Sequence, residues 1–519
     1  MASATLDTLF LEFPFPVLSG KPDSTRITGV TADSRQIQPG NLFVACRGER
    51  FDGHKFIFQA IEKGAGAIVG SDLITDLKIP YIQLENSRQS LAYLAAAFCE
   101  FPARKLTVIG VTGTDGKTTT CNIFHHILMQ AGIKTGLIST VNAVIGDQVL
   151  DTGLHVTTPD APDVQNYLAQ MVAAGLTHVV LETTSHGWAQ YRVDSCEFDI
   201  GIVTNITHEH LDEHGSYENY RAAKARLFLG LSETKLTPHG NIRLGVLNCD
   251  DRSYQYLLET LDTEYVSYGL NDCSDVRAVD IQYDPTGISF LAKGNGWQIP
   301  VKSELVGTFN VSNLLAVISA AVEGLRLPPH DVAEAILNFE GIPGRMERID
   351  LGQNFSAIVD FAHTPNALEN AISTARQITD KRVISVFGSA GLRDLEKRRM
   401  MAEISADLAD ISIFTAEDPR TESLDAILYD MATGAQSRGG VERRTFWQIP
   451  DRGEAIRFAI SIAKPGDVVI ACGKGHEQSM CFGTTEYPWD DRTATAAALD
   501  AYLNGSPMVD LGLPTFNDT

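Results

Sequence analysis

The segment Gly113-Thr-Asp-Gly-Lys-Thr118 has the residue types and the spacing of a turn that binds a nucleoside triphosphate. Glycines let backbone N–H groups face an anion, a lysine neutralises charge on the β- and γ-phosphates, and a threonine hydroxyl can ligate Mg²⁺. The strict pattern requires a glycine at Val111, whereas here Gly110 and Gly113 flank that position. An ordinary glycine turn is the alternative, but the apolar run before it and the helical pattern after it favour a phosphate site.

Glu182 follows the apolar segment His178–Leu181 and precedes four polar residues, 183–186. A carboxylate at the end of a strand is a suitable ligand for the Mg²⁺ that accompanies a triphosphate. A residue that simply faces solvent is the alternative interpretation. The neighbouring glycine turn favours the metal.

Histidines and carboxylates gather within one short segment: His208, Glu209, His210, Asp212, Glu213 and His214. These side chains are zinc ligands, but the HExxH order is absent and the segment follows a strand instead of lying on a helix. A single histidine that serves a second Mg²⁺ is the simpler interpretation, and His208 and His214 individually are expected at the surface or in supporting roles. Lys224 lies in an amphipathic stretch, 217–228, whose periodicity alone predicts a solvated lysine.

Polar clusters recur where apolar strands end, and the carboxyl ends of strands are where open α/β sheets bind ligands. Two rows of such clusters, in two domains, predict a cleft between domains. The clusters are Thr114–Thr118, Glu182–His186, Thr204–His210, Asp360–His363, Gly388–Gly391, Glu417–Arg420 and Gly473–Glu477.

The elements that must position these clusters alternate between strand and helix, which predicts an α/β fold with mostly parallel sheets. The first hundred residues form a compact α/β module with a helix near Phe56–Lys63, and 102–105 resemble a linker. We expect domains at 1–103, 104–343 and 344–519. The expected strands are Leu106–Val111, His178–Leu181, Ile200–Val203, Gly245–Leu247, Ala357–Val359, Val383–Phe387, Ile411–Phe414 and Val468–Ala471, with a helix at Thr119–Ala131.

The composition excludes several classes of function. The 519 residues carry a net charge of −23, so a nucleic-acid partner, which requires a basic surface, is not expected. The sequence contains neither the ~20 consecutive apolar residues of a membrane span nor a basic start typical of a signal peptide. Eight cysteines without a CxxC pair indicate neither a zinc knuckle nor a disulfide scaffold, so we expect the reducing cytoplasm.

The ordered set of motifs resembles the Mur ligases, and within them the UDP-N-acetylmuramoyl-tripeptide synthetases, over nearly the whole chain. The motifs are Asp33-Ser34-Arg35, Phe51-Asp-Gly-His54, Gly113–Thr118, Thr157-Thr-Pro159, Glu182, Asn205 to Asp212, Lys224, Gly307 to Asn313, Gly344 to Glu347, Asp360 to Pro365, Arg393 to Arg398, Glu417 to Arg420 and Gly473 to Glu477.

This resemblance implies three domains: an N-terminal module for the uridine nucleotide, a central P-loop ATPase-like sheet, and a C-terminal Rossmann-like domain for the amino acid. It implies that a D-glutamyl carboxylate attacks the γ-phosphate of ATP, and that an amine displaces phosphate from the acyl phosphate. Closure of the third domain would exclude water. The substrates would be UDP-N-acetylmuramoyl-L-alanyl-D-glutamate, ATP and a diamino acid, and family members are usually monomers.

Roles of individual residues follow from the same resemblance. The catalytic residues would be Lys117, Glu182, His210 and Lys224. Thr118, Glu182, His210 and Lys224 would bind two Mg²⁺ ions, with Lys224 carbamylated by CO₂. ATP would contact Gly113, Thr114, Asp115, Gly116, Lys117, Thr118, Thr119, Asn313, Arg345 and Asp360. The uridine-linked dipeptide would contact Ser34, Thr157, Thr158, Thr184, Gln190 and Arg192, and the amino acid Arg393, Asp418, Arg420, Gly473 and Glu477.

The chain departs from the family pattern at several positions. Asp115 replaces an asparagine, Thr183-Thr184 an apolar-serine pair, His208-Glu209 an Arg-Asp pair, and Ser389–Leu392 a Cys-Gly-Gly-Asp turn. Glu417-Asp-Pro-Arg420 stands where enzymes specific for meso-diaminopimelate usually carry Asp-Asn-Pro-Arg. Arg420 suits a carboxylate, whereas Asp418 would repel a distal carboxylate and attract a distal ammonium. We therefore favour L-lysine or L-ornithine over meso-diaminopimelate.

Two other functions are compatible with parts of the sequence. A related P-loop ligase, such as a folylpolyglutamate or cyanophycin synthetase, would share the central domain but should lack the motifs at Asp33–Arg35 and Phe51–His54. A nucleotide-binding scaffold without catalysis is disfavoured because the residues Lys117, Glu182, His210 and Lys224 are all present.

Overall fold

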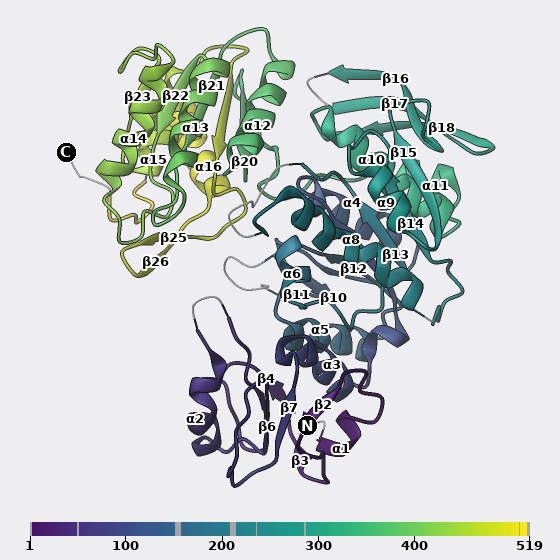
Figure 1. The fold of residues 1–519 in the computed structure, drawn as a ribbon. Helices are drawn as coiled ribbons and strands as arrows, with labels where there is room; N and C mark the ends of the chain where they lie inside the picture. Colours follow the sequence, from purple (N-terminus) through teal and green to yellow (C-terminus); the bar gives the residue numbers. More distant parts are fainter. Residues whose placement is uncertain are drawn as a thin grey trace. The chain divides into compact units, whose positions relative to one another are not determined.

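The computed structural model describes residues 3–48, 51–150, 157–207, 214–234, 236–284, 287–507 and 509–515 (Figure 1). The chain separates into two compact units, one built mainly from residues 1–279 and the other mainly from residues 337–519, with the segments between them divided. The fold is mixed α/β, as the sequence predicts. Among the described residues, no helix combines the length and apolar character needed to cross a membrane.

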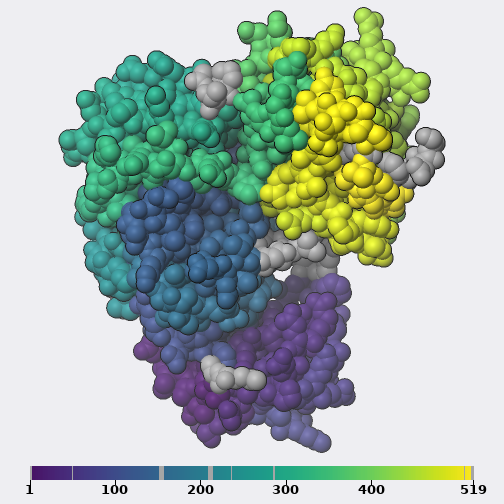
Figure 2. All heavy atoms as spheres, turned by 180° about the vertical axis from the view of Figure 1, so that it is seen from behind, coloured from purple at the N-terminus to yellow at the C-terminus, as the bar shows by residue number. Residues whose placement is uncertain are grey.

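The first hundred residues form a five-stranded sheet in the order β2-β7-β6-β5-β4. Its strands are β2 (Val17–Ser19), β4 (Val30–Thr31), β5 (Leu42–Val44), β6 (Ala67–Gly70) and β7 (Tyr81–Leu84). A small sheet pairs β1 (Ala4–Thr5) with β3 (Arg26–Ile27), and the helices of the module are α1 (Leu6–Leu9), α2 (Ile57–Glu62) and α3 (Ser87–Phe98). In the space-filling view from behind, the purple atoms of this module gather into one mass (Figure 2).

The helix expected near Phe56–Lys63 is present as a 3-10 turn, η1 (Gly53–Phe56), followed by α2. The segment expected as a linker forms another 3-10 helix, η2 (Pro102–Lys105), in which Pro102 and Ala103 are buried. Ala103 belongs to the hydrophobic core of the central domain, which holds the segment against that domain instead of leaving it extended.

The central sheet has eleven strands in the order β11-β10-β9-β12-β8-β13-β14-β15-β16-β17-β18. Parallel pairing joins β9, β12, β8, β13, β14, β15 and β16, so the expectation of a mostly parallel sheet is confirmed. The strands are β8 (Thr107–Thr112), β9 (Thr135–Ile138), β10 (Ala143–Ile145), β11 (Gln148–Leu150), β12 (His178–Glu182), β13 (Ile200–Val203), β14 (Leu244–Asn248), β15 (Glu264–Gly269), β16 (Val276–Asp284), β17 (Gly287–Gly294) and β18 (Trp297–Ser303).

Helices follow the strands of this sheet. Every residue of β8, β12, β13 and β14 is buried, which explains the continuous apolar runs in their sequences. The helices are α4 (Lys117–Gln130), α5 (Ala161–Ala173), α6 (Ser185–Ala189), α8 (Tyr217–Glu233), α9 (Tyr254–Thr260), α10 (Phe309–Ser319) with the π-helical turn η3 (Ala320–Gly324), and α11 (Pro329–Leu337).

The C-terminal domain contains a six-stranded sheet in the order β19-β20-β24-β21-β22-β23, parallel except for the edge strand β19. Its strands are β19 (Glu347–Ile349), β20 (Ser356–Asp360), β21 (Val383–Phe387), β22 (Ile411–Phe414), β23 (Phe446–Gln448) and β24 (Val468–Cys472). The hairpin β25 (Ser479–Phe482) and β26 (Thr485–Pro488) follows.

Two layers of helices cover this sheet (Figure 1). One core cluster joins the strands to α15 (Arg452–Ile462) and α16 (Asp491–Asn504). The other joins them to α12 (Pro365–Ile378), α13 (Leu395–Leu408) and α14 (Leu424–Ser437). Successive residues of a strand, such as Val383 and Ile384, enter different clusters because side chains alternate between the two faces of a sheet.

Candidate functional site

The glycine turn joins β8 to α4, so the amino end of the helix faces the turn, as in phosphate-binding loops. Gly113 has φ +152° and Gly116 has φ +80°. A Cβ on Gly113 would lie 1.8 Å from Thr204 Oγ1, and a Cβ on Gly116 would lie 2.4 Å from Asn313 Oδ1. Both positions therefore require glycine for space and for backbone conformation.

Residues that follow β13 brace this turn. The Asn205 Oδ1 atom accepts hydrogen bonds from the backbone N–H groups of Thr114 and Asp115 at 3.2 and 2.9 Å, and Thr204 Oγ1 donates to the Asp115 carbonyl at 2.6 Å. Asn205 belongs to one of the family motifs but is not among the predicted site residues. Its place directly after a buried strand that pairs with β8 was the available signal.

Lys117, Thr118 and Glu182 meet at this turn. Lys117 Nζ donates to the Thr114 carbonyl at 2.7 Å, and Thr118 Oγ1 donates to Glu182 Oε1 at 3.0 Å. Glu182 is only 1% exposed, and its Oε2 accepts the Thr140 N–H at 2.9 Å. The alternative of a solvent-facing strand end is therefore wrong. A hydroxyl and a carboxylate are hard oxygen donors, so this pair fits Mg²⁺.

Lys224 is 1% exposed, so the solvated position predicted from periodicity alone is wrong. It lies on α8, and its Nζ donates to the Gly113 carbonyl at 2.5 Å and sits 4.5 Å from the centre of the Tyr220 ring. The Tyr220 hydroxyl is 3.0 Å from Thr114 Oγ1. The structure therefore brings Lys224 to the glycine turn. His210 lies outside the described residues, as do all of 208–213.

Four of the residues expected to hold the muramoyl dipeptide form one hydrogen-bonded network: Thr158, Thr184, Gln190 and Arg192. Thr158 Oγ1 is 3.1 Å from Thr184 Oγ1, and Arg192 Nη1 donates to the Thr158 carbonyl at 2.6 Å. Arg192 Nη2 donates to Gln190 Oε1 at 2.8 Å. Burial lowers the pKa of Arg192, although Asp160 opposes this shift. Thr157 directly precedes Thr158 and is partly buried.

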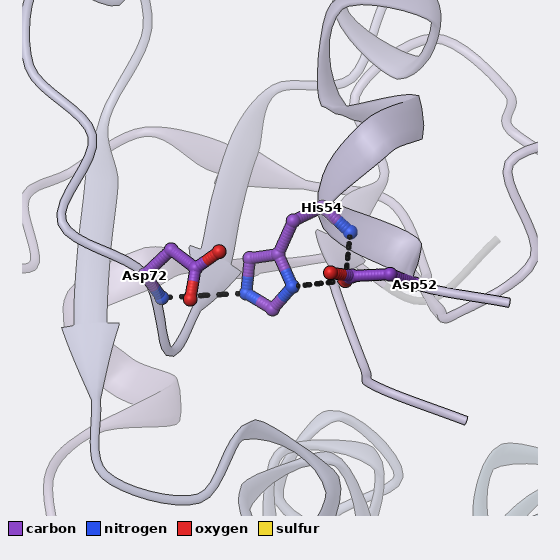
Figure 3. A group of neighbouring side chains, drawn as sticks. All are labelled: Asp52, His54 and Asp72. Carbon is purple, nitrogen blue, oxygen red and sulfur yellow. Dashed lines mark hydrogen bonds and ion pairs between the residues drawn. The ribbon is translucent and has the colours of Figure 1, made fainter. Parts of the chain in front are cut away.

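In the N-terminal module, Asp52, His54 and Asp72 approach one another (Figure 3). His54 Nδ1 lies 2.7 Å from Asp52 Oδ1, and His54 Nε2 accepts the Ser71 N–H at 2.9 Å. A backbone N–H can only donate, so the lone pair of Nε2 is used by Ser71 and the ring proton is on Nδ1, which faces Asp52. Neither ring nitrogen therefore has a free lone pair for a metal. The cluster ties η1 to the segment after β6.

A cavity of about 640 Å³ opens in the same unit. Its lining is Phe15, Pro16, Arg47, Ser71, residues 85–89 and Tyr191. Ser34, the residue predicted to contact the uridine nucleotide, is buried and does not line this cavity, and its carbonyl accepts a hydrogen bond from Lys63 Nζ at 2.9 Å.

In the C-terminal domain, Arg345 lies over the Phe361 ring, with Cζ 4.6 Å from the ring centre. Asp360 ends β20 and accepts N–H hydrogen bonds from Met346 at 2.7 Å and Ala362 at 2.8 Å. Burial raises the pKa of Asp360, while Arg345 acts in the opposite direction. Arg345 and Asp360, which are both among the residues predicted to contact ATP, therefore interact electrostatically.

Asp418 is buried and already has a cationic partner. Its Oδ1 accepts hydrogen bonds from Lys474 Nζ at 3.0 Å and the Cys481 N–H at 2.9 Å, and Lys474 Nζ also lies 2.5 Å from Glu477 Oε2. Asp418 is therefore one of two carboxylates that share Lys474, and does not act as the isolated charge that the sequence suggests. Lys474 was not predicted as a site residue.

Three further residues predicted to bind the amino acid, Gly473, Arg420 and Arg393, lie in loops of the same domain. A Cβ on Gly473 would lie 2.3 Å from Glu417 Oε2, so the loop after β24 approaches the loop after β22. Arg420 Nη1 donates to the Gly391 carbonyl at 3.3 Å, and Arg393 is exposed before α13. Burial raises the pKa of Glu417, although Lys397, Arg452 and Lys474 oppose this shift.

Comparison with known proteins identifies the class to which this fold and site belong. Residues 26–99 match the description "Mur ligase family, catalytic domain", residues 111–321 match "Mur ligase middle domain", and residues 344–475 match "Mur ligase, glutamate ligase domain". The chain belongs to the Mur ligase family and is an ATP-dependent amide-forming ligase of peptidoglycan synthesis.

Individual relatives extend over most of the chain. A UDP-N-acetylmuramyl-tripeptide synthetase of Roseiflexus sp. (strain RS-1) is 42% identical, covering 92% of this chain and 95% of the relative. A UDP-N-acetylmuramoyl-L-alanyl-D-glutamate--2,6-diaminopimelate ligase of Geobacillus thermodenitrificans is 41% identical, with coverage of 92% and 96%. A solved ligase of that second name superimposes with a TM-score of 0.67 at 28% identity, covering 96% of this chain and 99% of the other.

Proposed function

We propose that this ligase joins a diamino acid to UDP-N-acetylmuramoyl-L-alanyl-D-glutamate, with conversion of ATP to ADP and phosphate. The observation that carries the proposal is the convergence of Lys117, Thr118, Glu182 and Lys224 on one glycine turn. The names of the relatives support the choice of acceptor substrate.

The chain's own residues would bring anionic groups together. Backbone N–H groups of residues 113–119 and the Lys117 ammonium would hold the phosphates of ATP, so that the substrate's D-glutamyl carboxylate can reach the γ-phosphorus. The products of this step are an acyl phosphate and ADP. Asn313, Arg345 and Asp360 would contribute further contacts to ATP.

Mg²⁺ ions, held by Thr118, Glu182 and His210, would supply charge neutralisation between the phosphates and the carboxylate. We propose that the Lys224 ammonium loses one proton, and that the resulting amine adds to CO₂ with release of a second proton, which converts a cation into a carbamate with two oxygen donors. The buried position of Lys224 beside the Gly113 carbonyl supports this role, since an oxygen ligand there would lie next to the phosphate turn.

The muramoyl dipeptide would be held by Thr157 and by the network of Thr158, Thr184, Gln190 and Arg192, with Ser34 in the uridine module. Arg192 supplies a cation for this anionic substrate, and its hydrogen bonds to Gln190 and Thr158 fix the plane of the guanidinium group. Such positioning would hold the carboxylate in a reactive orientation.

For the amino acid, we propose L-lysine or L-ornithine in preference to meso-diaminopimelate. Asp418 and Glu477 share the single cation of Lys474, so this group of three keeps a net negative charge that favours a distal ammonium over a distal carboxylate. Arg420, Arg393 and Gly473 would bind the remaining polar groups of the amino acid.

We also propose the domain boundaries 1–103, 104–343 and 344–519, a monomeric enzyme and a cytoplasmic location. Size-exclusion chromatography with light scattering tests the monomer, and fractionation of cells tests the location.

Release of phosphate from ATP tests the function. We expect release that depends on both UDP-N-acetylmuramoyl-L-alanyl-D-glutamate and a diamino acid, and none from Lys117→Ala. Turnover with L-lysine, L-ornithine and meso-diaminopimelate is compared in the same assay. A strong preference for meso-diaminopimelate would defeat the amino-acid proposal, and phosphate release that ignores the muramyl substrate would indicate a ligase of the folylpolyglutamate or cyanophycin type.

A further inference from the structure

Arg452 is a fully buried arginine that joins the carboxyl ends of two strands. Its Nη1 donates to the Ala416 carbonyl at 3.2 Å, and its Nη2 donates to the Cys472 carbonyl at 2.8 Å. Ala416 lies just beyond β22, and Cys472 ends β24. The next residues in the chain are Glu417 and Gly473, which begin the loops 417–420 and 473–477.

Sheet hydrogen bonds do not connect these two strand ends directly, because β21 lies between β24 and β22. The planar fork of a guanidinium group can donate to several acceptors in fixed directions. Arg452 thereby fixes the peptide groups 416–417 and 472–473 relative to each other. The 2.3 Å separation between Glu417 Oε2 and a Cβ on Gly473 shows how closely the two loops approach at this point.

Asp491 orients the guanidinium group. Its two carboxylate oxygens accept hydrogen bonds from Arg452 Nε and Nη2, each at 2.7 Å, and Trp489 Nε1 donates to Asp491 Oδ1 at 2.8 Å. Both charged side chains are 0% exposed. The geometry of Arg452 is therefore determined on both sides, by the two carbonyls and by Asp491.

Stability alone is a poor reason for this arrangement. Desolvation of a buried ion pair offsets most of its attraction, and apolar residues of similar volume are often as stabilising. Arg452 is also the first residue of α15, where the positive end of the helix dipole disfavours a cation.

We propose that Arg452, oriented by Asp491, is a positioning residue for amino-acid recognition: it sets the relative orientation of the loops 417–420 and 473–477. The proposal rests on the function proposed above, since those loops carry the residues assigned to the diamino acid. It adds two residues that do not themselves contact a substrate.

The test measures the KM of the complete enzyme for the diamino acid, for ATP and for the muramyl substrate. In Arg452→Lys, a single ammonium cannot replace the fork, and we expect the KM for the diamino acid to rise about tenfold or more, with the other two KM values within about twofold. The matched control is Arg382→Lys. Arg382 pairs with Asp467 at the amino ends of β21 and β24, away from the loops 417–420 and 473–477. Its replacement should change thermal stability without changing the KM for the diamino acid.

A second variant covers the case in which Arg452→Lys fails to fold. Arg452→Met/Asp491→Asn removes both charges together and keeps an acceptor for Trp489, so neither member of the pair is left as an unpaired buried charge. The same selective rise in KM is expected from this double variant. Equal changes in all three KM values, or an unchanged KM for the diamino acid in a folded variant, would overturn the proposal. If the unmodified enzyme uses none of the three diamino acids, the proposed function fails instead.

Discussion

The side-chain nitrogen of Lys224 lies 2.5 Å from the carbonyl oxygen of Gly113, although 111 residues separate them in sequence. The amine is buried beside Tyr220, whose hydroxyl contacts Thr114 in the same turn. This relationship places a buried amine at the glycine turn, where we propose that ATP binds. Replacement of Lys224 should therefore affect catalysis more than folding.

Lys224→Arg should lower kcat by about 10²–10³-fold, because arginine keeps a positive charge and cannot form a carbamate. Arginine can still donate to the Gly113 carbonyl, so the fold should be preserved. Phosphate-release assays measure kcat, and ¹³C NMR of the unmodified enzyme in labelled bicarbonate should show a carbamate signal. Near-normal turnover of Lys224→Arg would contradict the assigned role.

Glu182→Gln should raise the Mg²⁺ concentration needed for half-maximal activity by about tenfold or more, because the amide lacks the charge that attracts the ion. Titration of activity against Mg²⁺ measures this change. Thr183→Val is the matched control, since the neighbouring hydroxyl donates to the Val111 carbonyl at 3.2 Å and has no proposed metal role. A normal Mg²⁺ dependence in Glu182→Gln would remove Glu182 from the metal site.

The sequence predicted the parts of the fold that depend on local pattern. The strands Ile200–Val203, Val383–Phe387 and Ile411–Phe414 have the predicted bounds, because a buried parallel strand reads as a continuous apolar run. The resemblance to the Mur ligases implies that Thr118 and Glu182 bind the same Mg²⁺, and the structure places Thr118 Oγ1 3.0 Å from Glu182 Oε1.

Partners supplied by distant segments could not be predicted in the same way. Lys224 looked solvated because periodicity describes a helix face and not what packs against it. The sequence prediction treated the charge of Asp418 alone. In the structure, Lys474, 56 residues further along the chain, pairs with both Asp418 and Glu477. Arg452 and Asp491 carry no local signal either, since an arginine at the start of a helix is ordinarily exposed.

Gly116→Ala should raise the KM for ATP by about tenfold or more, because the new Cβ would lie 2.4 Å from Asn313 Oδ1 and distort the turn. Gly132→Ala is the control. Gly132 has φ +75°, close to the +80° of Gly116, but no atom lies within 4 Å of its Cβ position. It should lose about 1 kcal/mol of stability with an unchanged KM. Equal KM values for both variants would show that Gly116 has only a conformational role.

Asp418→Asn should shift amino-acid preference toward meso-diaminopimelate, because Lys474 and Glu477 would then balance each other in charge. We expect the ratio of kcat/KM for L-lysine to that for meso-diaminopimelate to fall about tenfold, which corresponds to about 1.4 kcal/mol. Asp407→Asn, on α13 outside this group, changes the net charge of the chain equally and serves as the control. An unchanged ratio in Asp418→Asn would mean that the local charge does not select the amino acid.

Asp199 provides a test of stability against pH. Burial raises its pKa from 3.8 to about 7, although its carboxylate accepts the Val108 N–H at 2.8 Å. Because the folded state binds this proton more tightly than the unfolded state, the contribution to stability is complete below about pH 4 and is lost as pH rises toward about 7. Asp199→Asn keeps the acceptor without the charge. It should therefore be more stable than the unmodified enzyme by about 1–3 kcal/mol near pH 8 and nearly equal to it near pH 4. Chemical unfolding at both pH values measures the difference, and a constant gap between the two proteins would show that the carboxyl group of Asp199 does not titrate with folding.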